Sequence, residues 1–206
     1  MRVRGRPITL TDDQLLDAAR EVYLARGVDA TTAEIARRAR ISESVIFHRF
    51  KTKDALFTAV FERQIVLPPA FERLPALVGQ GEIADNLFDA GMGLVGLMQD
   101  VLPFMMMALS SAKMSIMRKH AQTPHPLRRQ LLALLSGYCD REARAGRLRR
   151  VKGDVFATLF LGGVMQYVMS EHVERSSERS NVPAFVRGLI DVLLHGAVDS
   201  QPRRRR

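Results

Sequence analysis

The sequence has one cysteine, Cys139, among 206 residues, and it has no tryptophan. A single thiol cannot form an internal disulfide or a cysteine-rich zinc site, so we expect a reducing, cytoplasmic setting. The most apolar stretches, such as residues 155–169, fall short of the ~20 residues that a membrane-spanning helix needs. The N-terminus alternates arginines without an apolar segment behind them, so no signal peptide is expected. Strand patterns and internal repeats are missing too, which predicts an all-α chain.

Sequence patterns for catalysis and cofactor binding are also missing. The five histidines have no metal-ligand spacing with a carboxylate beside them, and His120 and His125 flank a proline-containing loop. The chain has no nucleophile elbow, no P-loop and no dinucleotide fingerprint. We therefore expect no enzyme activity, no metal site and no cofactor.

Positive charge is present in excess, with 31 Lys and Arg against 22 Asp and Glu and a net charge of +9. The excess is weighted to the two ends, because residues 1–66 hold 12 basic and 9 acidic side chains and residues 203–206 are four arginines. Such a distribution suits a polyanionic partner. Arg4 and Arg6 belong to an N-terminal arm that we predict to lie along phosphates or in a narrow minor groove.

The stretch from Thr31 to Phe57 predicts two short helices joined by a tight turn, followed at once by a third helix. Thr31 and Glu34 have the spacing of a capping box. Ser42 and Thr52 are suitable N-caps for the next two helices. This arrangement predicts a helix-turn-helix motif.

The second helix of this motif, at about residues 42–49, has two distinct faces. Ile46 and Phe50 fall on the side that faces the core, and Ser44 and His48 lie opposite them. A helix of barely two turns with such an outer face suits the major groove of DNA. Glu43 fits either a contact to cytosine or the helix N-terminus. We predict DNA contacts by Arg4, Arg6, Thr31, Thr32, Ser42, Glu43, Ser44, Val45, Phe47, His48, Arg49 and Lys53, the last two as phosphate anchors.

Several of these residues agree with a known family at fixed spacing: Ile35-Ala36, Ser42, Ile46-Phe47, Phe50, Lys53 and Leu56-Phe57. With them, about residues 8–66 resemble the helix-turn-helix domain of TetR-type transcriptional regulators. Three positions depart from the family pattern. Arg40 stands where the turn usually has glycine, Phe47 replaces the usual tyrosine, and Arg49 replaces the commoner histidine or tyrosine.

The remainder of the chain has the pattern of a larger helical domain. Pro68-Pro69 cannot continue the fourth helix, so we place the domain boundary there. After a loop at 70–81, helices are predicted near residues 82–98, 101–118, 126–145, 153–174 and 182–197. The expected organisation is a DNA-binding domain of residues 1–66, a helical effector-binding and dimerisation domain of residues 67–202, and a basic tail of residues 203–206.

Nine of the ten methionines lie between Met92 and Met169. Methionine is flexible and polarisable, so it suits an adaptable apolar cavity, although ordinary core filling explains the cluster equally well. The TetR resemblance implies a small-molecule effector in this domain. Gly91, Gly93 and Gly96 leave room on one helix face for a ligand or for close packing. The predicted effector contacts are Met98, Gln99, Met105, Met106, Ser110, Tyr138, Gln166 and Tyr167.

The last two predicted helices have broad apolar stripes. One stripe must pack against its own domain, and the surplus suits a two-fold partner. The TetR resemblance implies a homodimer in which these helices form a four-helix bundle, and therefore a palindromic operator. The predicted dimer residues are Phe156, Leu159, Phe160, Gly163, Phe185, Leu189, Val192 and Leu193.

These patterns predict a homodimeric transcriptional repressor that a small hydrophobic effector releases from double-stranded DNA, with no membrane partner. A constitutive DNA-binding regulator or architectural protein is an alternative, and it would have a fully packed larger domain. An acyl-chain carrier or membrane-surface protein is a second alternative. It would explain the methionines but not the recognition helix.

Overall fold

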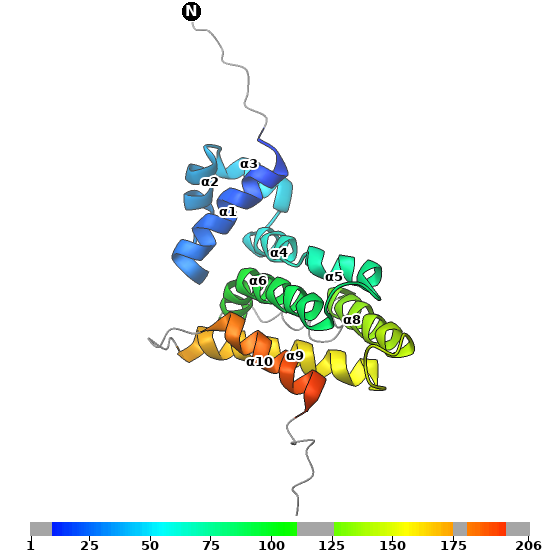
Figure 1. The fold of residues 1–206 in the computed structure, drawn as a ribbon. Helices are drawn as coiled ribbons and strands as arrows, with labels where there is room; N and C mark the ends of the chain where they lie inside the picture. The colour runs from blue at the N-terminus through cyan, green and yellow to red at the C-terminus, as the bar shows by residue number, and fades with distance from the viewer. Residues whose placement is uncertain (1–9, 111–125, 175–180, 197–206) are drawn as a thin grey trace, which may run out of the picture. The chain divides into compact units, whose positions relative to one another are not determined.

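The structure is a computed structural model that describes residues 10–110, 126–174 and 181–196. All regular secondary structure in these ranges is helical (Figure 1). Arg4, Arg6 and the tail at residues 203–206 lie outside the described residues. The chain forms two compact units. We call the first, which contains residues up to Ile65 and the segment that begins at Val101, the head, and the second, formed by Val66–Asp100 and the chain from Pro124 onward, the larger unit.

The head begins with four helices around a small apolar core. They are α1 (Asp12–Arg26), α2 (Thr32–Ala39), α3 (Glu43–Phe50) and α4 (Lys53–Gln64), with a 3-10 turn, η1 (Gly27–Asp29), after α1. The spacing of apolar residues at three and four positions puts one side chain per turn into this core. Among the side chains that have no solvent exposure are Leu15, Ile35, Ile46 and Leu56.

Helix starts in the head follow the capping signals of the sequence. The Thr31 hydroxyl accepts from the Glu34 N–H at 3.2 Å, and the Glu34 carboxylate accepts from the Thr31 N–H at 2.9 Å. Thr52 caps α4 by accepting from the Ala55 N–H at 3.0 Å. Ser42 occupies the N-cap position of α3, but its side chain does not cap the helix. The predicted N-cap position of Ser42 is confirmed, and the side-chain hydrogen bond of such a cap is not formed.

The helix α6 spans Ile83–Ser110 without interruption, where the sequence predicted separate helices at 82–98 and 101–118. Residues 111–118 lie outside the described residues. Pro103 lies inside α6 and has no N–H for the carbonyl of Gln99, four residues earlier. The division between the two units falls at this weakened turn, between Asp100 and Val101.

By length and apolar composition, α6 could cross a membrane, and it is the one helix of the described ranges with this property. It is longer than the apolar stretches that we expected from the sequence. Side chains from both parts of α6, such as Leu94 and Phe104, are buried inside the protein. Core helices of soluble proteins share this composition, so α6 is explained as a core helix.

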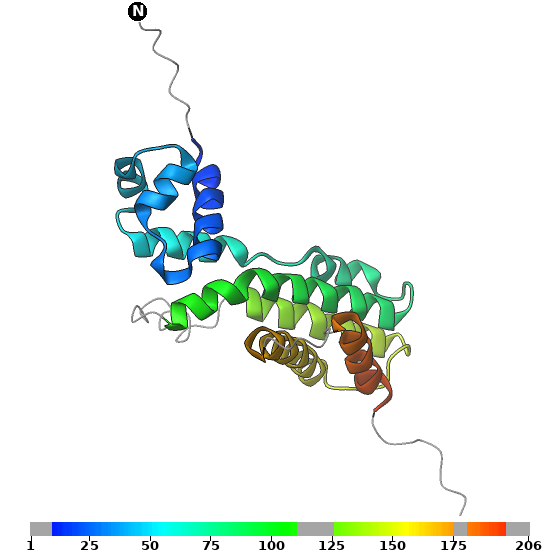
Figure 2. The same cartoon turned by 90° about the vertical axis from the view of Figure 1, so that its left-hand side faces the viewer.

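The larger unit contains the first part of α6 and the helices α5 (Pro69–Arg73), η2 (Leu74–Leu77), α8 (Pro126–Arg144), α9 (Gly153–Glu174) and α10 (Val182–His195). Of these, α8 and α10 both pack against α9 (Figure 2). Glycines allow close approaches between them. A Cβ atom at Gly91 would lie 2.6 Å from Val186, and one at Gly93 would lie 3.1 Å from Pro68. These two glycines therefore serve packing and leave no room for a ligand.

The pair α9 and α10 packs tightly within one chain. A Cβ atom at Gly163 would lie 2.9 Å from Leu189, and the Tyr167 and Phe185 rings stack at 3.9 Å. Phe160 has no solvent exposure, and Phe156, named in the predicted dimer set, is buried as well. Prediction of these two phenylalanines as dimer contacts is wrong, because they fill the core of their own unit.

Candidate nucleic-acid interface and effector cavity

The outer face of α3 carries the exposed side chains expected of a recognition helix. Ser44 and His48 are exposed, and Phe47 is 44% exposed although it is a large apolar residue. On the other face, Ile46 is completely buried in the head core. The helical repeat thus separates one face that anchors α3 from one that is free to meet a partner.

The N-terminus of α3 is tied to α2 by side chains. The Thr32 hydroxyl donates to the Glu43 carboxylate at 2.6 Å, and the hydroxyls of Ser42 and Ser44 lie 2.7 Å apart. Glu43 lies in the first helical turn, where its negative charge is favourable. Of the two interpretations of Glu43, this geometry favours the helix N-terminus.

Arg49 has a structural role that the sequence did not predict. Its guanidinium donates to the Leu10 carbonyl at 2.7 Å and to the Asp12 carboxylate at 2.8 Å, and its side chain is 26% exposed. The guanidinium therefore holds the start of α1 against the end of α3. The assignment of Arg49 as a free phosphate anchor is corrected, since both of its terminal nitrogens already have protein acceptors.

Two residues at the ends of the helix-turn-helix have positive φ angles. Arg40, at the C-cap of α2, is left-handed with φ 56° and ψ 43°, at the position where the family usually has glycine. Lys51 has φ 62° and ψ −44°, and the next N–H donates back to the Phe50 carbonyl at 2.6 Å. This is a γ-turn of the rare, strained kind. Both turns fix where α3 begins and ends, and no sequence signal predicted the one at Lys51.

Lys53 is half-buried, and its ammonium donates to the Val28 carbonyl at 3.2 Å. This places the charge at the first turn of α4, beside the end of α3. Thr31 is exposed at the start of α2, whereas Thr32 and Val45 are half-buried. The positions of Lys53 and Thr31 are consistent with the predicted backbone contacts, which stay predictions.

The Glu34 carboxylate is held as an anion. The Thr31 N–H, the Arg26 guanidinium and the Thr31 hydroxyl all donate to it and lower its pKa to about 2. Because the carboxylate caps α2, this charge stabilises the helix that leads into the turn.

An aromatic chain links α6 to the head core. Phe57 contacts Tyr23 edge-on at 5.1 Å between ring centroids, and Phe104 at 6.0 Å. Burial, and then the Asp54 carboxylate, raise the pKa of Tyr23, so its hydroxyl stays protonated. Phe104 has no solvent exposure and lies in the stretch of α6 that belongs to the head.

The same stretch of α6 corrects part of the predicted effector site. Met105 packs against the head core, and Met106 and Ser110 also belong to the head. None of these three residues lines the cavity found in the larger unit. Apolar side chains in this stretch serve to hold α6 on the head.

A cavity of about 350 Å³, open to solvent on one side, lies within the larger unit. Several of its lining residues are exposed, among them Thr158 and Met165. Two predicted effector residues, Met98 and Gln166, line it. The other lining residues come from α8 and α9, and they are Arg128, Leu132, Thr158, Leu161, Gly162, Met165 and Met169. The sequence missed most of them, because their shared face depends on how α8 packs on α9.

The remaining predicted effector residues of the larger unit have other roles. Tyr138 is completely buried, and its hydroxyl accepts from the Asn86 amide at 3.0 Å. Burial is the main cause that raises its pKa to about 12. Tyr167 stacks on Phe185, and Gln99 is exposed and does not line the cavity. None of these three residues lines this cavity, and their effector contacts stay predictions.

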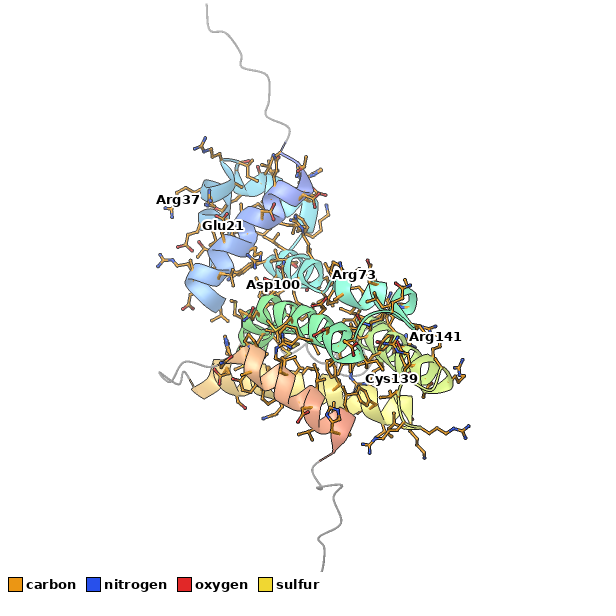
Figure 3. The ribbon with its side chains drawn as sticks, in the orientation of Figure 1. Glu21, Arg37, Arg73, Asp100, Cys139 and Arg141 are labelled. Carbon is orange, nitrogen blue, oxygen red and sulfur yellow. The ribbon has the colours of Figure 1, made fainter. Side chains whose placement is uncertain are left out.

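Two further grooves have other chemistry. One of about 610 Å³ on the head is lined by four arginines and two glutamates, among them Arg37 and Glu21 (Figure 3). Ion pairs already cross it from Arg38 to Glu21 and from Arg26 to Glu34. Such a lining does not suit an apolar effector.

The other groove, of about 460 Å³, lies where α9 and α10 meet the loop before α9. Leu159 is 55% exposed and Val192 is 52% exposed there, beside the partly buried Leu193. With Val155, they leave apolar surface of α9 and α10 uncovered. Within the described part of the chain, no group of three His, Cys, Asp or Glu side chains could hold a metal ion.

Comparison with known proteins agrees with this geometry. Residues 15–60 match the sequence profile of the bacterial regulatory proteins of the tetR family. The chain is 41% identical over 54 residues to YvkB of Bacillus subtilis, an uncharacterised helix-turn-helix-type transcriptional regulator. This match covers 26% of the chain and 29% of YvkB, so it spans less than a third of either protein.

Solved structures extend the likeness to the whole fold. The transcriptional regulator FadR from Bacillus subtilis, in complex with stearoyl-CoA, has a TM-score of 0.66 at 16% identity and covers 91% of this chain and 100% of FadR. SmeT, the repressor of the Stenotrophomonas maltophilia multidrug efflux pump SmeDEF, has a TM-score of 0.62 at 18% identity. The match covers 90% of this chain and 89% of SmeT. At these identities the likeness shows the fold.

Proposed function

We propose, from the premise that this chain is a TetR-family transcriptional regulator, that it is a repressor released from a palindromic operator by a small hydrophobic effector. The observation that carries the proposal is the outer face of α3. Ser44, Phe47 and His48 are exposed there, while Ile46 anchors the helix in the core. Side chains of this size and polarity can read base edges and thymine methyl groups in a major groove.

A homodimer would present two copies of α3. The exposed Leu159 and Val192 on α9 and α10 support a two-fold interface, because apolar surface of this kind is stabilised by burial in a partner. Two heads related by a two-fold axis require a palindromic operator with half-sites about one helical turn or more apart. The proposed setting is the cytoplasm, where the DNA is.

An effector of hydrophobic character is supported by the cavity in the larger unit. A fully packed body would have favoured a constitutive regulator, whereas the open cavity of about 350 Å³ lies at the lower end of the range of small-molecule sites. FadR was solved with stearoyl-CoA, and SmeT is named a repressor. These two descriptions support the same kind of function for this chain.

The helix α6 provides a route from the cavity to the head. Met98 lines the cavity, and Phe104, six residues later in the same helix, is buried in the head core. At 1.5 Å per residue these positions are about 9 Å apart along the helix. We propose that an occupied cavity favours a position of α6 in which the two heads no longer fit the operator. Coupling of this kind is typically about 1–3 kcal/mol.

Selection of bound sequences from random duplex DNA tests the proposal directly. A palindromic consensus is expected, and addition of hydrophobic compounds should release it. Ser44→Ala and His48→Ala should change the preferred bases at a cost of about 1–3 kcal/mol for each good base contact. Lys53→Ala should weaken binding to all DNA sequences similarly, and it should lower the dependence of the affinity on salt concentration, the salt slope, by about one. Arg73→Ala removes the same charge from the larger unit, and it should leave the DNA affinity and the salt slope unchanged.

Opposite results would discriminate between the alternatives. Absence of any sequence preference at moderate salt would exclude a specific regulator. A consensus that no hydrophobic compound releases would favour the constitutive regulator. Binding to lipid vesicles without sequence-specific DNA binding would favour the membrane-surface protein.

A further inference from the structure

The cavity in the larger unit has one charged side chain in its lining. Its apolar walls are Met98, Leu132, Leu161, Met165 and Met169, and the charged side chain is Arg128 in the first turn of α8. None of the described residues that line the cavity is acidic. From this asymmetry we propose that the effector is an amphiphile with an anionic head group, and that Arg128 binds this group. The inference deepens the proposed function and rests on it.

The polar groups around the cavity differ in how far they are already satisfied. The Thr158 hydroxyl donates to the Asp154 carbonyl at 2.8 Å, and the Gln166 amide donates to the Ser170 hydroxyl at 3.2 Å. Arg128 is exposed at the open side of the cavity, and it forms no hydrogen bond or ion pair with the described residues. Its N–H donors are therefore available to a ligand, while those of the neighbouring polar side chains are partly used.

A guanidinium at an apolar wall selects ligands by charge. Its planar fork matches a carboxylate or a phosphate, which can accept two parallel hydrogen bonds. A neutral amphiphile of the same length would fill the apolar walls without gaining these bonds. A cationic amphiphile would bring a second positive charge to a site with no acidic lining residue, which is unfavourable.

The volume limits the size of the tail. One water molecule occupies roughly 30 Å³ of liquid volume, so a cavity of about 350 Å³ holds about a dozen heavy atoms of similar size. Decanoate, with ten carbons and two oxygens, has this size. It is a suitable probe for an anionic head group on a medium-length apolar tail.

Calorimetric titration of the full-length protein tests the proposal. The probes are decanoate, decyl phosphate, 1-decanol and decyltrimethylammonium, all below the concentrations at which they form micelles. We expect decanoate or decyl phosphate to bind at least tenfold more tightly than decanol, and the cationic probe to bind most weakly. The two anionic probes distinguish a carboxylate head group from a phosphate.

Variants of two adjacent arginines provide the matched comparison. Arg128→Gln should weaken binding of the anionic probe about tenfold or more and leave decanol binding unchanged. Arg128→Lys should restore part of the loss, because it keeps the charge and loses the fork. Arg129→Gln removes the same charge from the next residue, which does not line the cavity, and it should bind all probes like the unaltered protein.

The proposal is overturned if decanol binds as tightly as both anionic probes, or if neither anionic probe binds. It is also overturned if Arg128→Gln and Arg129→Gln lose affinity equally. Thermal unfolding of each variant shows whether the exposed substitutions leave the fold intact. Operator release is measured separately. If the anionic probe binds through Arg128 and the DNA is not released, the ligand class stands and the proposed repressor mechanism fails.

Discussion

Replacement of Arg49 by glutamine separates two interpretations of the helix-turn-helix. The sequence pattern predicts a phosphate anchor at this position. In the structure the guanidinium instead donates to the Leu10 carbonyl at 2.7 Å and to the Asp12 carboxylate at 2.8 Å. A glutamine side chain is shorter and uncharged, so Arg49→Gln should lose both interactions. We therefore expect loss of stability rather than loss of DNA affinity.

The magnitude follows from the two contacts. A hydrogen bond from a charged donor contributes about 1.5–3 kcal/mol. The ion pair adds less than about 1 kcal/mol, because Asp12 is 71% exposed. Arg49→Gln should therefore destabilise the protein by about 2–3 kcal/mol. For a chain of this length, the melting temperature should fall by roughly 4–12 °C.

Thermal unfolding and DNA binding at several salt concentrations measure the two effects independently. Asp12→Asn is the matched control, since it weakens the ion pair and keeps the bond to the Leu10 carbonyl. It should cost no more than about 1 kcal/mol. The reasoning is refuted if Arg49→Gln melts like the unaltered protein while its salt slope falls by about one, because a phosphate anchor behaves in that way.

Three further predictions follow from the conformation and burial of single residues. Arg40→Gly should raise the free energy of unfolding by about 0.5–1 kcal/mol in urea titrations, because glycine adopts the left-handed conformation without strain; a decrease would mean that the arginine side chain stabilises the turn. The pKa of Glu34 is lowered to about 2 from its ordinary value of 4.5. Its contribution to stability is therefore present above pH 4.5 and is lost as the pH falls toward 2. In urea titrations across this range, the free energy of unfolding of Glu34→Gln should depend less on pH than that of the unaltered protein. An equal dependence in the two proteins would contradict this role of Glu34. Burial raises the pKa of Cys139 to about 12, so a thiol reagent at pH 8 should label the native protein slowly and the unfolded protein fast. Fast labelling of the native protein would contradict its burial.

Local signals in the sequence predicted most of the head. The capping box at Thr31 forms as its spacing requires, because both partners lie within one helical turn. The separation of Ile46 from Ser44 and His48 follows from the helical repeat alone. Residue types and their spacing therefore determined the helix-turn-helix, its exposed face and the resemblance to TetR-type regulators.

Contacts between distant segments decided the rest. Arg49 meets Asp12 across 37 positions, and Phe104 meets Phe57 across 47, so no local pattern could assign them. The methionines were assigned to one cavity, but Met105 packs on the head and Met98 lines the cavity, although both lie on α6. Apolar character favours burial of a side chain. Only the packing of helices shows which core or cavity receives it.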